Sequence, residues 1–202
     1  MQVVGDPANA LVSMGPLVNM TQRKTVEEGI RELNTQAEFV YWPEDFSPVD
    51  ADAERGAFVP PMLLKTRGTS DSEVVNRVEV FGPVATVIPY RDKQHAFELA
   101  RRGGGSLAAS VFSPDAAFLA EAGAALGTSH GRVLLVDPSI AESHTGHGIV
   151  LPSLMHGGPG RAGGGEELGG LHGLWFYHQR TALQGSGATL AAVSEKAADP
   201  TA

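Results

Sequence analysis

Apolar residues recur at helical spacing near the start of the chain. Between Thr21 and about Ala37 they fall at positions 26, 30, 33 and 37, which lie on one face of an α-helix. This pattern predicts an amphipathic helix whose apolar face packs against the rest of the protein.

Further along, short apolar runs alternate with helical patterns. Runs typical of strands occupy 39–42, 57–64, 84–88, 107–112 and 132–136. Helices are predicted over 93–102 and from Pro114 to about Leu126, with Ser113 as the expected N-cap of the second. The paired prolines at 60 and 61 predict an edge or bulged strand, and 84–88 is the best candidate for a core strand. This alternation predicts an α/β fold with a mostly parallel sheet and flanking helices.

Glycine is concentrated in one segment. From His156 to Gly173, nine of 18 positions are Gly, a density that lets another chain or a ligand approach the backbone closely. The segment leads into an aromatic run, 174–179, that is typical of a strand.

Composition and charge narrow the function classes. The formal net charge is −8, from 15 Lys and Arg against 23 Asp and Glu, which disfavours nucleic acid as a partner. The absence of cysteine excludes disulfides, thiolate zinc sites and any thiol nucleophile within this chain. No apolar run is long enough to span a membrane, and the first residues lack a secretory pattern, so we expect no membrane association and a cytoplasmic protein.

A serine-hydrolase motif occurs near the middle of the chain. Gly127–Gly131 fits G-x-S-x-G, and Asp137 and His147 follow Ser129 in the chain order of an esterase triad. The segment is expected to follow a helix and precede a strand, which is the reverse of a nucleophile elbow. We interpret it as a helix-to-strand turn and keep a hydrolase that uses Ser129 as a remote alternative.

Three other motifs have better structural than chemical interpretations. Gly158–Gly163 fits the dinucleotide pattern G-x-G-x-x-G, but no strand precedes it and no acidic residue follows at the required spacing, so a close-packing loop is expected. His144 and His147 lack carboxylates at matching spacing, and no metal site is predicted. Glu166 and Glu167 are interpreted as a charge pair at a helix start.

The most specific string is Glu79–Val84, E-V-F-G-P-V, directly before the run at 84–88. A carboxylate followed by an aromatic ring and a Gly-Pro turn can bind a hydroxylated ring and place an aromatic face beside it. From the residues alone, a solvated Glu79 and a core Phe81 explain the same letters.

This string resembles the E-[IV]-F-G-P-V string of the aldehyde dehydrogenase superfamily. Residues 5–7 (GDP) and 14–18 (MGPLV) are similar to the family's GDP…GPL stretch, and 105–112 (GSLAASVF) to its G-L-A-A-S-V-F strand. The resemblance runs from about residue 3 to 192. It implies the catalytic-domain part of an aldehyde dehydrogenase fold.

A narrower resemblance concerns the branch of the family. Residues 156–170 and 179–185, together with the turn at 101–105, resemble enzymes of phenylacetate and benzoate degradation. Those enzymes oxidise a CoA-thioester semialdehyde to the acid with NADP or NAD. The resemblance therefore implies a CoA-linked semialdehyde as the substrate of the complete enzyme.

The resemblance also implies roles for two residues. Glu79 corresponds to the carboxylate that hydrogen-bonds the nicotinamide ribose hydroxyls, and Phe81 to the aromatic residue beside the nicotinamide. The family's Cys nucleophile and Glu base are expected upstream of Met1. No catalytic residue is therefore assigned here, and we expect the isolated chain to be inactive.

The same resemblance suggests three segments. Residues 1–172 would be a catalytic-domain segment that lacks its nucleophile, 173–192 a C-terminal oligomerisation strand, and 193–202 a disordered polar tail. We expect a homo-oligomer or association with the missing upstream domain. A non-catalytic assembly or regulatory module derived from the family is the alternative function.

Overall fold

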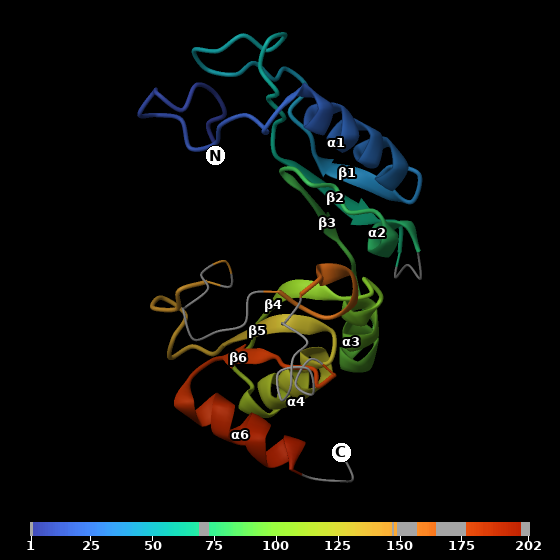
Figure 1. Ribbon diagram of the computed structural model, residues 1–202, viewed down its shortest axis with the longest axis vertical. Helices are drawn as coiled ribbons and strands as arrows, with labels where there is room; N and C mark the ends of the chain where they lie inside the picture. Colours follow the sequence, from blue (N-terminus) through green and yellow to red (C-terminus); the bar gives the residue numbers. More distant parts are fainter. Residues whose placement is uncertain (1, 69–72, 147, 149–156, 165–176, 199–202) are drawn as a thin grey trace. The chain divides into compact units, whose positions relative to one another are not determined.

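The computed structural model describes residues 2–68, 73–146, 148, 157–164 and 177–198 (Figure 1). The chain divides into two compact units, Met1–Asp92 and Lys93–Ala202. Each unit contains a three-stranded sheet with helices beside it, which confirms the α/β class. In the described part of the chain, no helix is both long and apolar enough to cross a membrane.

Helix α1 (Met20–Leu33) forms where the spacing predicts it. The side chain of Asn19 accepts a hydrogen bond from the Gln22 backbone N–H at 2.8 Å, which satisfies a donor that the first turn leaves unpaired. The apolar residues at positions 26, 30 and 33 are buried, as predicted. The helix ends at Leu33, with Asn34 as its C-cap, and so is shorter than predicted: Ala37 belongs to strand β1 (Ala37–Tyr41).

The sheet of the first unit has the order β1-β2-β3, with β2 at Met62–Thr66 and β3 at Val84–Val87. β1 pairs antiparallel with β2, and β2 pairs parallel with β3. The short helix α2 (Val74–Arg77) lies between β2 and β3 in the chain.

Two sequence predictions about these strands are wrong. β2 is central rather than at an edge, because the paired prolines precede Met62, and the register shift in its pairing with β1 falls on β1, between Phe39 and Tyr41. β3 is an edge strand of the described sheet rather than a buried one. Its outward residues Ala85 and Val87 are exposed, Val87 by 45%, because nothing described covers that face.

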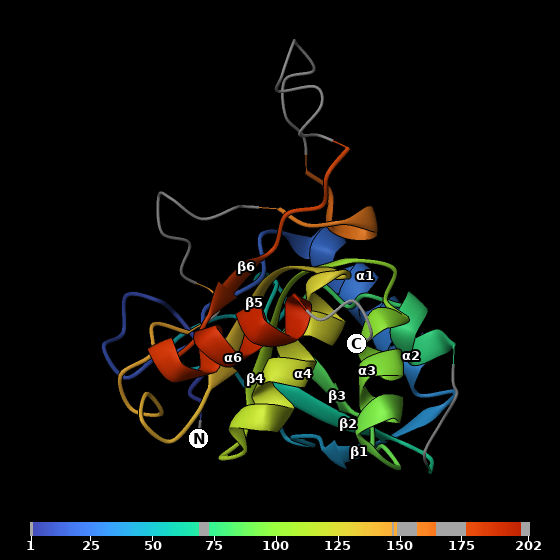
Figure 2. The same cartoon turned by 90° about the horizontal axis from the view of Figure 1, so that it is seen from below.

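The second unit contains a fully parallel sheet with the order β4-β5-β6. Its elements are α3 (Lys93–Arg101), β4 (Ser106–Phe112), α4 (Ala116–Gly127), β5 (His130–Val136), the 3₁₀ turn η1 (Gly160–Ala162), β6 (Ala182–Gln184) and α6 (Gly187–Ala197). Figure 2 shows α4 and α6 side by side on one face of this sheet. The core between them includes Leu119, Val133, Leu135 and Val193. The predicted alternation of strands and helices over residues 84–136 is therefore present, although β3 belongs to one sheet and β4 and β5 to the other.

The start of α4 differs from the prediction. Its N-cap is Asp115, whose carboxylate accepts hydrogen bonds from the backbone N–H groups of Ala117 and Phe118 at 2.9 and 3.2 Å. Ser113 instead accepts a bond from the Asp115 N–H at 3.1 Å. A charged acceptor suits this position because the helix N-terminus carries partial positive charge.

The C-terminal region is helical where a strand and a disordered tail were expected. Residues 173–176 lie outside the described part, and within 177–192 only the short β6 is a strand. Helix α6 then begins after Ser186, whose hydroxyl accepts a hydrogen bond from the Thr189 N–H at 3.3 Å. Val193 packs into the core, so residues 187–197 gain a buried face as well as alanine's helix propensity.

The glycine-rich segment packs against the strands of its own unit. A Cβ on Gly131 would lie 1.8 Å from the carbonyl oxygen of Gly157, and one on Gly105 would lie 1.9 Å from that of Pro159. The close approach is therefore made by the chain's own backbone, whereas the sequence predicted another chain or a ligand. The turn η1, rather than an α-helix, follows Pro159, which agrees with a packing loop and not with a dinucleotide fingerprint.

Candidate cofactor site

The E-V-F-G-P-V string forms a turn that leads into β3. The Gly82 N–H donates to the Val80 carbonyl and the Val84 N–H to the Gly82 carbonyl, both at 2.8 Å, so two three-residue turns follow one another. Val80 packs inward, whereas Phe81 is 74% exposed and Glu79 is exposed. A core position for Phe81, the alternative that the residues alone left open, is therefore wrong.

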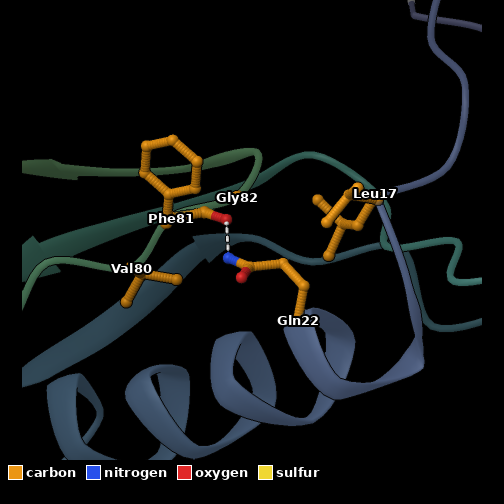
Figure 3. A pocket seen from close by; sticks show the side chains of 6 residues that line it. Leu17, Gln22, Val80, Phe81 and Gly82 are labelled. Carbon is orange, nitrogen blue, oxygen red and sulfur yellow. Dashed lines mark hydrogen bonds between the residues drawn. The ribbon is translucent and has the colours of Figure 1, made fainter.

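Helix α1 holds this turn in place. The Gln22 side-chain N–H donates to the Phe81 carbonyl at 2.7 Å (Figure 3). Gly82 lies so close to the helix that a Cβ there would be 2.8 Å from Cγ2 of Val26. The turn needs glycine at this position because α1 occupies the space of a side chain.

An open pocket of about 380 Å³ lies between the start of α1 and this turn (Figure 3). It is mostly apolar and is lined by Leu17, Val18, Gln22, Val80, Phe81 and Gly82. Figure 3 shows the Gln22 amide between Leu17 and Phe81. The strings at 14–18 and 79–84, on which the family resemblance depends, thus contribute to one pocket although they are far apart in the chain.

The chemistry of this pocket suits a flat aromatic ring. Its volume lies at the lower end of the range for small-molecule sites, about 300–1,000 Å³. The exposed ring of Phe81 offers a face for packing, and Glu79, two residues before it, offers carboxylate oxygens to hydroxyl donors. Glu79 itself is not among the residues that line the pocket.

Gln22 is the part of this site that the sequence did not predict. A polar residue in the first turn of an amphipathic helix is most often simply solvated. Its partner, the Phe81 carbonyl, is 59 residues further along the chain. The GPLV string, which precedes the helix, was the only local signal that this region belongs to a site.

Ser129 and His130 do not form a catalytic pair. Nδ1 of His130 lies 2.9 Å from the Ser129 hydroxyl and 3.1 Å from the Leu126 carbonyl. A carbonyl only accepts, so Nδ1 carries a proton and cannot serve as the base for Ser129. Burial lowers the pKa of His130, and the hydrogen bond to the Leu126 carbonyl partly opposes this shift.

Asp137, one of the two partners that the sequence offered for Ser129, is also misplaced. Asp137 follows the opposite end of β5, about 23 Å from His130 at roughly 3.3 Å per residue. His147 lies outside the described residues. The motif is the helix-to-strand turn between α4 and β5, as the sequence indicated.

Asp137 has a structural role instead. Its carboxylate accepts hydrogen bonds from the Ser139 and Ser186 hydroxyls, from the Ser139 N–H at 2.8 Å and from the Thr189 hydroxyl at 3.0 Å. These bonds, that of the Ser139 hydroxyl first and that of Ser186 next, hold the pKa of Asp137 well below its usual range. The carboxylate thereby joins the end of β5 to the start of α6.

Metal-binding side chains do not converge in the described part of the chain, where no group of three His, Cys, Asp or Glu residues could hold an ion. The ring of His144 packs edge-on against Phe112, with 6.0 Å between centroids. Glu166 and Glu167 lie outside the described residues.

Comparison with known proteins identifies the class of this chain. Residues 1–181 match the aldehyde dehydrogenase family. The chain belongs to this family of oxidoreductases, as the resemblance implied. Its fold is similar to that of a betaine aldehyde dehydrogenase point mutant from Staphylococcus aureus, solved in complex with NAD+. The TM-score is 0.66 at 24% identity, over 81% of this chain and 30% of that one.

Two curated relatives are similar to this chain, and the name of the second is that of a CoA semialdehyde dehydrogenase. The chain is 44% identical over 184 residues to Protein MaoC of Klebsiella aerogenes, covering 91% of this chain and 53% of that protein. It is 48% identical over 157 residues to the 3,4-dehydroadipyl-CoA semialdehyde dehydrogenase of Aromatoleum evansii, covering 77% of this chain and 30% of that protein. The chain thus spans about half the length of the first relative and less than a third of the second.

Proposed function

We propose that this chain is the C-terminal catalytic segment of an NAD(P)-dependent aldehyde dehydrogenase. The complete enzyme would oxidise a CoA-linked semialdehyde to the acid in the degradation of aromatic compounds. The observation that carries this proposal is the apolar pocket shared by residues 14–18 and 79–84. The relative named for 3,4-dehydroadipyl-CoA semialdehyde supports the substrate class.

The pocket would receive the nicotinamide-ribose end of NAD or NADP. When bound, the cofactor supplies the acceptor for the hydride that leaves the aldehyde carbon. Phe81 would pack against the nicotinamide ring, and Glu79 would accept hydrogen bonds from the ribose hydroxyls. Gln22 would hold the Phe81 backbone against α1, so that ring and carboxylate keep their positions.

The remaining chemistry would come from other residues of the complete enzyme. The chain has no cysteine, so it cannot itself supply the thiolate that attacks the aldehyde in this family. In this proposal its part is to bind and orient the reacting end of the cofactor.

An assembly or regulatory role is a second candidate. Large apolar side chains are exposed on the first unit, including Val40 at 56%, Val87 at 45% and Tyr90 at 59%. They favour association with another chain, either a second copy or the upstream part of a complete enzyme. The oligomerisation role of 173–192 and a cytoplasmic location both stay predictions.

The cofactor site is tested with nicotinamide mononucleotide, which lacks the adenosine half of NAD. In saturation-transfer NMR we expect the nicotinamide protons to receive magnetisation from the full chain, and Phe81→Ala to abolish most of this transfer. We expect Glu79→Gln to weaken binding about tenfold, since a hydrogen bond to a charged group contributes about 1.5–3 kcal/mol.

Two variants serve as matched controls. Phe112 is 64% exposed in the other unit, and Glu38 is exposed on β1, outside the pocket. Phe112→Ala and Glu38→Gln should bind like the unmodified chain. The cofactor assignment is wrong if the nucleotide does not bind, or if the Phe81 and Glu79 variants bind as these controls do.

A further inference from the structure

Two neighbouring residues in the first turn of α1 serve the two sides of the proposed cofactor pocket. On one side, Gln22 donates to the Phe81 carbonyl at 2.7 Å. Arg23 points elsewhere, because successive residues of an α-helix are about 100° apart around its axis. The loop that Arg23 contacts, at 52–57, leads to the other side of the pocket, where Leu17 lies.

The guanidinium of Arg23 binds this loop and its own helix together. Nη1 donates to the Ala53 carbonyl at 2.7 Å and to the Gly56 carbonyl at 3.2 Å, and Nε to the Glu27 carboxylate at 3.0 Å. The Arg23 side chain is only 28% exposed, so these bonds are partly shielded from water. A planar guanidinium can serve several acceptors at once, which a single ammonium group does less well.

The hydrogen bonds within the loop explain why it needs a cation. The Asp52 carboxylate accepts from the Glu54 N–H at 2.8 Å, and the Asp52 carbonyl accepts from the Gly56 N–H at 2.9 Å. Residues 52–56 thus form one helix-like turn, and the last carbonyl groups of a helical segment have no partner within it. Arg23 supplies donors to two of these carbonyls.

This turn is connected to the side of the pocket opposite Phe81. Ala57 follows it directly and is buried, so the chain enters the core at this point. The Ala57 carbonyl accepts from the Leu17 N–H at 2.9 Å. Leu17 lines the pocket, and Figure 3 shows it across the Gln22 amide from Phe81. A chain of contacts therefore joins Arg23 to this wall.

We propose that Arg23 is a positioning residue of the cofactor pocket. By holding the turn at 52–56 it fixes the Leu17 side, as Gln22 fixes the Phe81 side. The pocket then keeps its width in the free protein, and a flat ring can enter it without first ordering its walls. Such preorganisation strengthens binding, because less freedom is lost when the ligand binds. The identity of that ligand rests on the function proposed above.

Amide hydrogen exchange of the full chain, without nucleotide, tests the support of Leu17. Its N–H is protected by the bond to the Ala57 carbonyl. We expect Arg23→Met to speed its exchange roughly tenfold, because the turn loses its bonds to a charged donor. The amide of Ile30, on the buried face of the same helix, should exchange at an unchanged rate. Equal acceleration of both amides would show a general loss of stability and overturn the proposal.

A double-mutant cycle with nicotinamide mononucleotide tests the effect on the pocket. We expect Arg23→Met and Leu17→Ala each to raise the Kd by about fivefold, the first through a looser wall and the second through lost apolar contact. Because Arg23 acts through Leu17, the double variant should bind no more weakly than Leu17→Ala alone. Two effects that multiply would contradict this coupling.

Arg31→Met is the matched control, since Arg31 is exposed in the last turn of the same helix. It should change neither the exchange of the Leu17 N–H nor the affinity for the nucleotide. If the unmodified chain binds no nucleotide, the cofactor assignment fails, and the exchange rates still decide whether Arg23 holds the Leu17 wall. If the nucleotide binds and Arg23→Met behaves as Arg31→Met does, the positioning role alone is refuted.

Discussion

Gly131 shows how a single residue can match a catalytic motif for a purely structural reason. It is the last residue of the G-x-S-x-G match and lies within β5. A Cβ there would meet the backbone of Gly157, at 1.8 Å from its oxygen and 2.8 Å from its carbonyl carbon. Backbone atoms cannot rotate aside as a side chain can, so glycine is required by packing rather than by chemistry.

We expect Gly131→Ala to lower the free energy of unfolding by about 2 kcal/mol, within the range of about 1–3 kcal/mol for overpacking. Gly187→Ala is the control, because no atom lies within 4 Å of a Cβ there. At that helical position alanine should be neutral or stabilise by about 0.5–1 kcal/mol. Urea denaturation measures both variants, and equal stabilities would contradict the close approach of the two glycines.

At the scale of elements, one carboxylate joins a strand to a helix. Asp137 follows β5 and accepts hydrogen bonds from Ser186 and Thr189 at the start of α6. Its folded pKa is depressed, so the native state favours the charged form. This contribution to stability is fully present above the unfolded pKa of about 3.9 and is lost as the pH falls through the folded pKa.

We therefore expect Asp137→Asn to be less stable than the unmodified chain at pH 7, because the amide replaces a charged acceptor of hydroxyl bonds. The difference between the two should shrink progressively as the pH falls below about 4. Denaturant titrations over this pH range measure it. Glu195→Gln, an exposed change on the same helix, should show no such trend, and a pH-independent deficit for Asp137→Asn would refute the linkage.

The elements that the sequence predicted best are those with a strong local period. α1, α3 and α4 follow from apolar spacing, and β1, β4 and β5 from short apolar runs. Helix α6 was missed because its support is not local. Val193 of α6 packs against α4. The N-cap of α6, Ser186, donates a hydrogen bond to Asp137, which lies 49 residues earlier. The division into two sheets was missed for the same reason, since strand pairing joins distant segments.

At the scale of the whole molecule, the candidate site was predicted only in part. Glu79 and Phe81 were identified through their string, and the structure leaves both exposed to solvent. Gln22 and the pocket were not predicted, because they depend on the packing of α1 against a turn from a distant part of the chain.

The last prediction concerns the activity of the whole chain. We expect the purified protein to produce no measurable NAD(P)H from aldehydes, including a CoA-linked semialdehyde, although it binds nicotinamide mononucleotide. Removing a catalytic nucleophile costs orders of magnitude in rate, and this chain contains no cysteine. Absorbance of the reduced cofactor measures the rate, with a complete aldehyde dehydrogenase as the positive control. Turnover that Glu79→Gln abolishes would contradict the prediction, because such turnover belongs to the chain and not to a contaminant. A residue other than cysteine would then have to attack the aldehyde.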